Sequence, residues 1–132
     1  MPGYTIVNLL EVEDSVSGRV EGLEGRFARK QLESRDLGVS HWRYAPNFRS
    51  PFNHTHRVQE EAYVVVSGSG RVRLEDEVHD LRRHAHDVPE TEVVRAFQAG
   101  PDGLELVAVG GPKPEEGDGV QSDAPWPGAA GD

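Results

Sequence analysis

The sequence predicts a single all-β domain, built as a barrel or a sandwich. Segments rich in β-branched and aromatic residues recur at intervals of roughly ten residues, which is the spacing of short strands. Glycine, proline and aspartate lie between these segments at positions suited to turns, and helical periodicity is weak. The chain of 132 residues is long enough for one barrel core and too short for two.

Each strand is predicted from its own run of residues. In chain order, the expected strands are residues 4–9, 26–32, 39–45, 62–66, 71–74, 78–81, 93–97 and 104–109. We expect a loop over the charged, glycine-punctuated residues 11–25, and turns at residues 68–70, 75–77 and 100–103.

Alternation in the third expected strand assigns its two faces. Val39, His41 and Arg43 face one way, and Ser40, Trp42 and Tyr44 face the other. The two aromatic side chains are expected to pack in the core.

Composition excludes several classes of function. The net charge of −9 argues against a nucleic-acid partner, because phosphate binding relies on a cationic surface. No apolar run approaches the length of a membrane span, and the N-terminus lacks the pattern of a signal peptide, so we predict a cytoplasmic protein with no membrane partner. The absence of cysteine excludes disulfides and thiolate chemistry.

A cluster of metal-ligating residue types opens the most regular stretch of the chain. His54 and His56 are separated by one residue, so both imidazoles lie on one face of an extended strand. Glu61 follows just before the run Ala62–Val66. Two neutral imidazoles and one carboxylate suit a borderline divalent metal ion and can leave coordination positions open.

The spacing His-x-His, four residues, Glu, six residues, Gly resembles the first signature motif of the cupin superfamily. The resemblance implies a double-stranded β-helix, the jelly-roll barrel of the cupins. It also implies that His54, His56 and Glu61 hold one divalent ion (Fe, Mn, Ni or Zn), that Gly68 forms the turn between strands, and that the chain forms a homodimer.

The resemblance covers about residues 39–109. It divides the chain into a barrel over residues 1–110, N-terminal strands included, and a tail over residues 111–132. The tail is rich in proline, glycine and acidic residues, so we expect it to be mobile, with Trp126 as its one anchor.

Arg95 stands where the second cupin motif carries its histidine ligand. A divalent cation about 5 Å from a guanidinium is repelled by roughly 7 kcal/mol at an effective dielectric constant of about 20. Two interpretations stay open: Arg95 grips a substrate carboxylate, or it forms a structural ion pair with Glu61 or another acid. His84 and His86 are weaker candidates for a replacement ligand, and His79 is expected at the surface.

Three functions therefore compete. The first is a small cupin that binds a divalent metal and acts on a small organic acid. The second is a non-catalytic barrel that binds or senses a small anion, such as a carboxylate. The third, which the resemblance implies, is a structural or assembly role through pairing of sheet edges in a dimer. The candidate ligand-binding residues are Arg95 and Tyr63, together with His41 and Arg43 if these two face the barrel interior. The sequence leaves open whether the chain is an enzyme.

Overall fold

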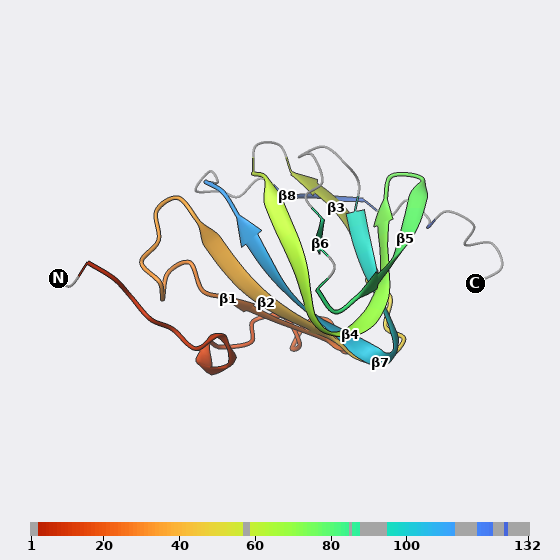
Figure 1. Cartoon of the computed structure of the whole chain (residues 1–132), viewed down its shortest axis with the longest axis horizontal. Coiled ribbons are helices and arrows are strands. Elements are labelled where there is room, and N and C mark those ends of the chain that lie inside the picture. The colour runs from red at the N-terminus through yellow and green to blue at the C-terminus, as the bar shows by residue number, and fades with distance from the viewer. Residues whose placement is uncertain are drawn as a thin grey trace.

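The computed structural model describes residues 3–56, 59–84, 86–87, 95–112, 119–122 and 126. In this part of the chain the structure is all-β, as predicted, with a single short 3-10 helix, η1 (Leu9–Glu11) (Figure 1). The strands are β1 (Leu23–Phe27), β2 (Gly38–Tyr44), β3 (Asn53–His56), β4 (Glu61–Leu74), β5 (Glu77–Arg82), β6 (His86–Asp87), β7 (Arg95–Gly110) and β8 (Gly119–Ser122). None of the described helical residues forms a segment long and apolar enough to cross a membrane.

Two long antiparallel strands, β4 and β7, hold the architecture together. They pair from Glu61↔Gly110 at one end to Leu74↔Arg95 at the other, and the register shifts twice between Val65 and Gly70. The first half of β4 and the second half of β7 lie with β1, β2 and β6, whereas the other halves lie with β3, β5 and β8. Both strands bend in the middle, so one continuous ladder contributes to two facing layers (Figure 1).

Glycine makes this bend possible. Gly68 has a φ of +77°, and a Cβ atom at this position would lie 2.1 Å from the carbonyl oxygen of Gly103. Gly103 has a φ of +83°. The predicted turns at residues 68–70 and 100–103 are therefore wrong as breaks between strands. These residues bend two strands that remain paired, because a positive φ and a close backbone approach are both open to glycine.

Other boundaries follow the sequence to different degrees. The strand expected at 39–45 is β2, and the acidic turn expected at 75–77 closes the β4–β5 hairpin with Leu74 opposite Glu77. The strand expected at 4–9 is wrong: η1 begins at Leu9, and Ile6 is 86% exposed. The strand expected at 26–32 instead spans Leu23–Phe27. β-branched content predicts a strand only where a neighbouring strand is available for pairing.

The C-terminal segment contributes to the barrel. β8 pairs antiparallel with β3, and places Gln121 opposite His54 and Gly119 opposite His56. Trp126 is buried, with the guanidinium carbon of Arg49 4.8 Å from its ring centre. Within the tail expected to be mobile, residues 119–122 pair with β3, and Trp126, the expected anchor, is buried against Arg49. The remaining tail residues beyond 112 lie outside the described part.

The core lies between the two layers. Tyr63 of the first layer packs on Phe97 of the second with ring centres 5.0 Å apart, and Tyr44 lies 6.2 Å from the same ring. The other members of this buried cluster are Leu23, Val65, Val72, Leu81, Ala99, Leu104, Leu106 and Ala108. These apolar contacts drive the closure of one layer onto the other.

The bend gives a direct test of the fold. Gly68→Ala should lower the free energy of unfolding by at least about 2 kcal/mol, because the new methyl group meets the Gly103 carbonyl and the left-handed backbone disfavours alanine. Urea denaturation measures the change. The matched control is Gly18→Ala, because a Cβ atom added at Gly18 would have no neighbour within 4 Å. Equal stability of the two variants would contradict a bend at Gly68.

Candidate functional site

Four polar side chains from both layers meet inside the barrel. His54 lies in β3 and its Cα partner across the ladder is Arg95, the first residue of β7. Glu61 and Tyr63 lie in the first half of β4, which belongs to the other layer. The site is therefore assembled across the interior, from the starts of three strands.

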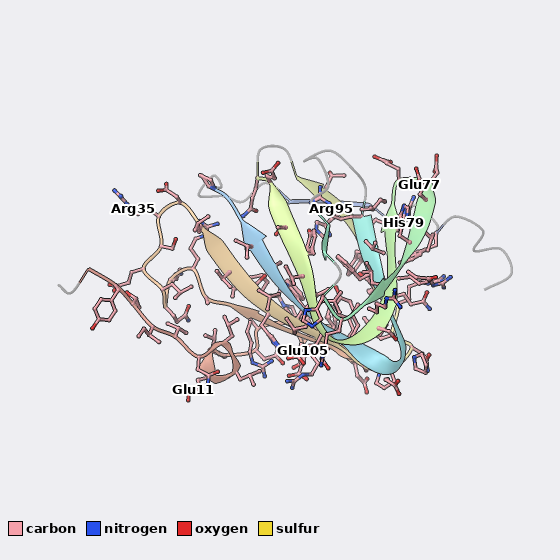
Figure 2. All side chains as sticks on the ribbon, viewed as in Figure 1. Glu11, Arg35, Glu77, His79, Arg95 and Glu105 are labelled. Carbon is pink, nitrogen blue, oxygen red and sulfur yellow. The ribbon has the colours of Figure 1, made fainter. Side chains whose placement is uncertain are left out.

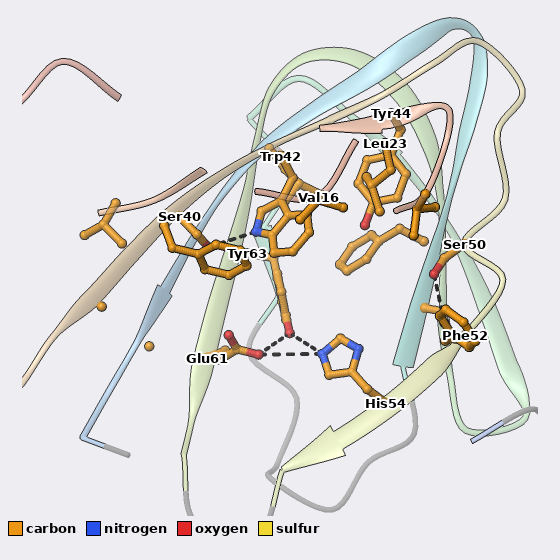
Figure 3. A pocket seen from close by; sticks show the side chains of 18 of the residues that line it. Val16, Leu23, Ser40, Trp42, Tyr44, Ser50, Phe52, His54, Glu61 and Tyr63 are labelled. Atoms are coloured by element: carbon orange, nitrogen blue, oxygen red, sulfur yellow. Dashed lines mark hydrogen bonds and ion pairs between the residues drawn. The ribbon is translucent and has the colours of Figure 1, made fainter. Parts of the chain in front are cut away.

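Glu61 is the centre of this group. The Tyr63 hydroxyl donates a hydrogen bond of 2.6 Å to Glu61 Oε1. His54 Nε2 lies 3.7 Å from the same carboxylate oxygen and 3.4 Å from the Tyr63 hydroxyl (Figure 3). The side chain of His54 is 34% exposed and that of Glu61 is 17% exposed. A molecule inside the barrel can therefore reach both groups.

Arg95 lies behind Glu61 and has no exposed surface. Its Nη1 is 3.6 Å from Glu61 Oε1, which is the geometry of a buried ion pair. Of the two interpretations left open by the sequence, this geometry matches the structural ion pair with Glu61. With no exposed surface, the guanidinium neutralises part of the charge of the Glu61 carboxylate.

The environment of Glu61 also sets the protonation of two tyrosines. Burial, and then the negative charge of Glu61, raise the pKa of Tyr63 well above its usual value, and the positive charge of Arg95 lowers it in part. The same two causes, burial first, raise the pKa of Tyr44. Both phenols therefore stay protonated at neutral pH, and Tyr63 is fixed as a hydrogen-bond donor towards Glu61.

Two donors of the predicted metal site lie close enough to share one ion, while a positive charge beside them opposes a metal. Two donor atoms that each bind one ion at about 2.1 Å lie no more than about 4.2 Å apart, and His54 Nε2 and Glu61 Oε1 meet this condition. The side chain of His56 lies outside the described part, and no group of three candidate ligands occurs among the described side chains. Arg95 shares the carboxylate, and its charge weakens the binding of a second cation.

His41 and Arg43 lie on the opposite face of β2. His41 Nε2 contacts Glu105, and Arg43 lies 3.6 Å from Glu105 and 3.7 Å from Glu24. The predicted alternation is therefore correct, and it directs these two side chains away from the interior. The interior position that would make them ligand-binding residues is therefore not what the structure shows: they contact Glu105 and Glu24 on the face of β2 opposite the cavity.

The other histidines that the structure describes are at the surface. His79 is half exposed beside Glu77, as the sequence predicts (Figure 2). His84 is exposed, in a turn with a φ of +75°. The side chain of His86 lies outside the described part.

A cavity of about 940 Å³ opens in front of the polar group. Its wall includes His54, Glu61 and Tyr63 and, from β2, Ser40, Trp42 and Tyr44 (Figure 3). Alternation along β2 indicates the interior position of these last three residues. The N-terminal part of the wall comes from Val16, Val20 and Leu23, which lie in the segment expected to be a loop and were not among the predicted site residues. The available signal for this wall was the spacing of Val16 and Val20, four residues apart, with Leu23 following them.

Comparison with known proteins finds matches among solved structures only. No protein-family model and no curated protein matches the sequence. Among solved structures, a cupin protein from Bacteroides fragilis superposes with a TM-score of 0.71 at 17% identity, covering 87% of this chain and 89% of that one. A sugar phosphate isomerase of the cupin superfamily from Silicibacter pomeroyi gives 0.72 at 15% identity, covering 92% and 95%. The chain has the cupin fold.

A third cupin comparison is with one part of a larger protein. An oxalate decarboxylase variant from Bacillus subtilis superposes with a TM-score of 0.72 at 21% identity, over 89% of this chain and 33% of that one. The resemblance predicted from the His54–Gly68 spacing is thus confirmed for the fold. At identities of 15%, 17% and 21% the comparison shows the fold alone, so the activities named for those proteins are not assigned to this chain.

The buried tyrosines of this cupin barrel predict an alkaline transition. Their folded pKa values lie above the unfolded value of about 10, so stability is fully present below pH 10 and falls as the pH rises and the unfolded phenols lose their protons. Each tyrosine contributes a slope that grows through about pH 10 towards a limit of about 1.4 kcal/mol per pH unit, reached when the unfolded phenol is fully ionised. Urea denaturation at pH values from about 9 to about 11 measures this slope, because the range spans the unfolded pKa of about 10.

Tyr63→Phe should reduce this slope by the share of one tyrosine. The matched control is Tyr4→Phe, because Tyr4 is 71% exposed. Equal slopes in the Tyr63→Phe variant and the unmodified protein would show that the Tyr63 phenol is not buried against Glu61.

Proposed function

We propose that this chain is a small-molecule-binding cupin whose ligand enters the interior cavity and is held at its polar end. The observation that carries the proposal is the convergence of His54, Glu61 and Tyr63 at one end of that cavity, with Arg95 next to Glu61. Convergent polar groups in a large concave site are the usual mark of a ligand-binding site. A small carboxylate is the proposed ligand class, and the homodimer expected from the resemblance remains a prediction.

A divalent metal ion is part of this proposal. His54, His56 and Glu61 would hold it, and their donor types suit Fe, Mn, Ni or Zn. When bound, such an ion supplies a Lewis acid that polarises an oxygen of the ligand. The chain's own contribution is the placement of the donors: His54 on β3 and Glu61 on β4 face each other, and Tyr63 orients the carboxylate through its hydrogen bond.

The test is the metal content of protein purified without a histidine tag. We expect one divalent ion per chain, and His56→Ala should reduce it to a small fraction. His79→Ala is the matched control, because His79 is a surface histidine beside an acidic residue. Full occupancy in His56→Ala, or no metal in the unmodified chain after supplementation, would contradict the metal site.

A second candidate function needs no metal. In it the barrel binds or senses a small anion without catalysis, and the ion pair of Arg95 with Glu61 favours this candidate. The guanidinium compensates the charge of Glu61, so an anion approaching His54 and Tyr63 meets less repulsion. Ligand binding by chelator-treated protein, at an affinity that added metal does not change, would select this candidate over the first.

Arg95 separates the two candidates in a single variant. Arg95→His removes a positive charge beside Glu61 and adds an imidazole, so metal affinity should rise at least about tenfold. Loss of the buried ion pair should lower the free energy of unfolding of the metal-free protein by about 3 kcal/mol. Metal titration calorimetry and urea denaturation measure the two effects. Arg83→His, at an exposed arginine, is the control.

If Arg95→His changes neither metal affinity nor stability, Arg95 does not pair with Glu61 in solution. A fall in stability without tighter metal binding would instead support the metal-free candidate.

A further inference from the structure

Beyond its polar end, the cavity wall is mainly apolar. Val16, Val20 and Leu23 line it from the N-terminal segment, and Trp42 lines it from β2. The indole nitrogen of Trp42 already donates a hydrogen bond of 2.8 Å to Ser40 Oγ, so the ring offers apolar surface to the cavity (Figure 3). A ligand as small as a two-carbon acid would cover little of this wall.

Two aromatic side chains of the wall are open to solvent. Phe27 is 49% exposed and Phe52 is 45% exposed, and both line the cavity. Phe27 packs edge-on against Trp42, with ring centres 5.2 Å apart. Exposed aromatic surface gathered around a cavity is covered favourably by an apolar ligand, because the ligand removes that surface from water.

The charges of the wall favour an anion. Arg19 and Arg29 line the cavity, and the carboxylate of Glu61 is compensated by Arg95 behind it. The Arg29 guanidinium donates to the carbonyl of Gly111 at 2.9 Å, and that of Arg19 donates to Ser15 at 3.4 Å. Carbonyl acceptors leave both positive charges in place. The cavity is thus positive in a chain with a net charge of −9.

We infer that this cavity takes a monocarboxylate with an aromatic body. The ring lies against Trp42, Phe27 and the N-terminal valines, and the carboxylate is attracted by the positive charges of Arg19 and Arg29. This inference rests on the proposed function for the location of the ligand and goes further by naming its class. It holds with or without a metal ion, because the apolar wall and Arg19 are separate from the three metal-donor residues.

The test is calorimetric titration of the full chain, chelator-treated, with three probes. Phenylpropionate carries both features, phenylpropanol carries the ring without the charge, and acetate carries the charge without the ring. Phenylpropionate should bind at least about tenfold tighter than acetate, because it buries a ring, and also tighter than phenylpropanol. Any other order of affinities would overturn the inference.

Two variants locate the binding. Phe27→Ser should weaken phenylpropionate binding about tenfold, and Arg19→Gln should reduce the preference for phenylpropionate over phenylpropanol. Leu37→Ser and Arg35→Gln are the matched controls, because both residues are exposed in the loop before β2; Arg35 is labelled in Figure 2. If the controls weaken binding as much as the cavity variants do, the probes bind elsewhere and the inference fails. Metal content tests the metal site separately, so failure of this inference and failure of the proposed metal site are distinguishable.

Discussion

The buried contact between Arg95 and Glu61 is the constraint on which the site depends. Arg95 begins β7 in one layer of the barrel, and Glu61 begins β4 in the other. A guanidinium without exposed surface is tolerated only beside a compensating charge, and Glu61 Oε1 lies 3.6 Å away. This requirement fixes Glu61 in place and brings the two layers to a defined separation at this end of the barrel.

The rest of the polar group follows from that pair. With Glu61 held by Arg95, its Oε1 is positioned to accept from Tyr63 at 2.6 Å and to face His54 at 3.7 Å. Tyr63 in turn packs on Phe97, so the hydrogen-bonded group is rigidly joined to the apolar core. The result is one polar end in an otherwise apolar cavity. Such an arrangement can orient a ligand through its head group while the wall recognises the body.

Local sequence patterns predicted the two faces of β2, the fold and the meeting of His54 with Glu61. Alternation placed Trp42 and Tyr44 on the face of β2 that lines the cavity and His41 on the opposite face, where it is also buried and contacts Glu105. The spacing from His54 to Gly68 indicated the cupin fold, and the structure brings His54 and Glu61 together. The pairing of Arg95 with Glu61 was one of two interpretations that the sequence left open. The choice between them needed the burial of Arg95, a property of the assembled layers.

What the sequence could not predict depends on contacts between distant segments. The residues next to Gly68 in the sequence predict a turn there. In the structure Gly68 instead lies at a bend in a continuous ladder, where its backbone closely approaches Gly103 of the partner strand. Residues 119–122 have weak strand propensity and form β8 because β3 offers them a free edge. Val16 and Val20 gain a role at the cavity only because the N-terminal segment packs against the barrel.

A double-mutant cycle on Arg95 and Glu61 measures the central contact most directly. Arg95→Met and Glu61→Gln each remove one charge, and the double variant removes both while retaining side-chain volume. The two single changes should each destabilise the protein strongly, and the double variant should recover at least about 2 kcal/mol relative to their sum, because neither charge is then left buried alone. Effects that add within about 0.5 kcal/mol would show that the two side chains do not interact, and would contradict an ion pair at the centre of the site.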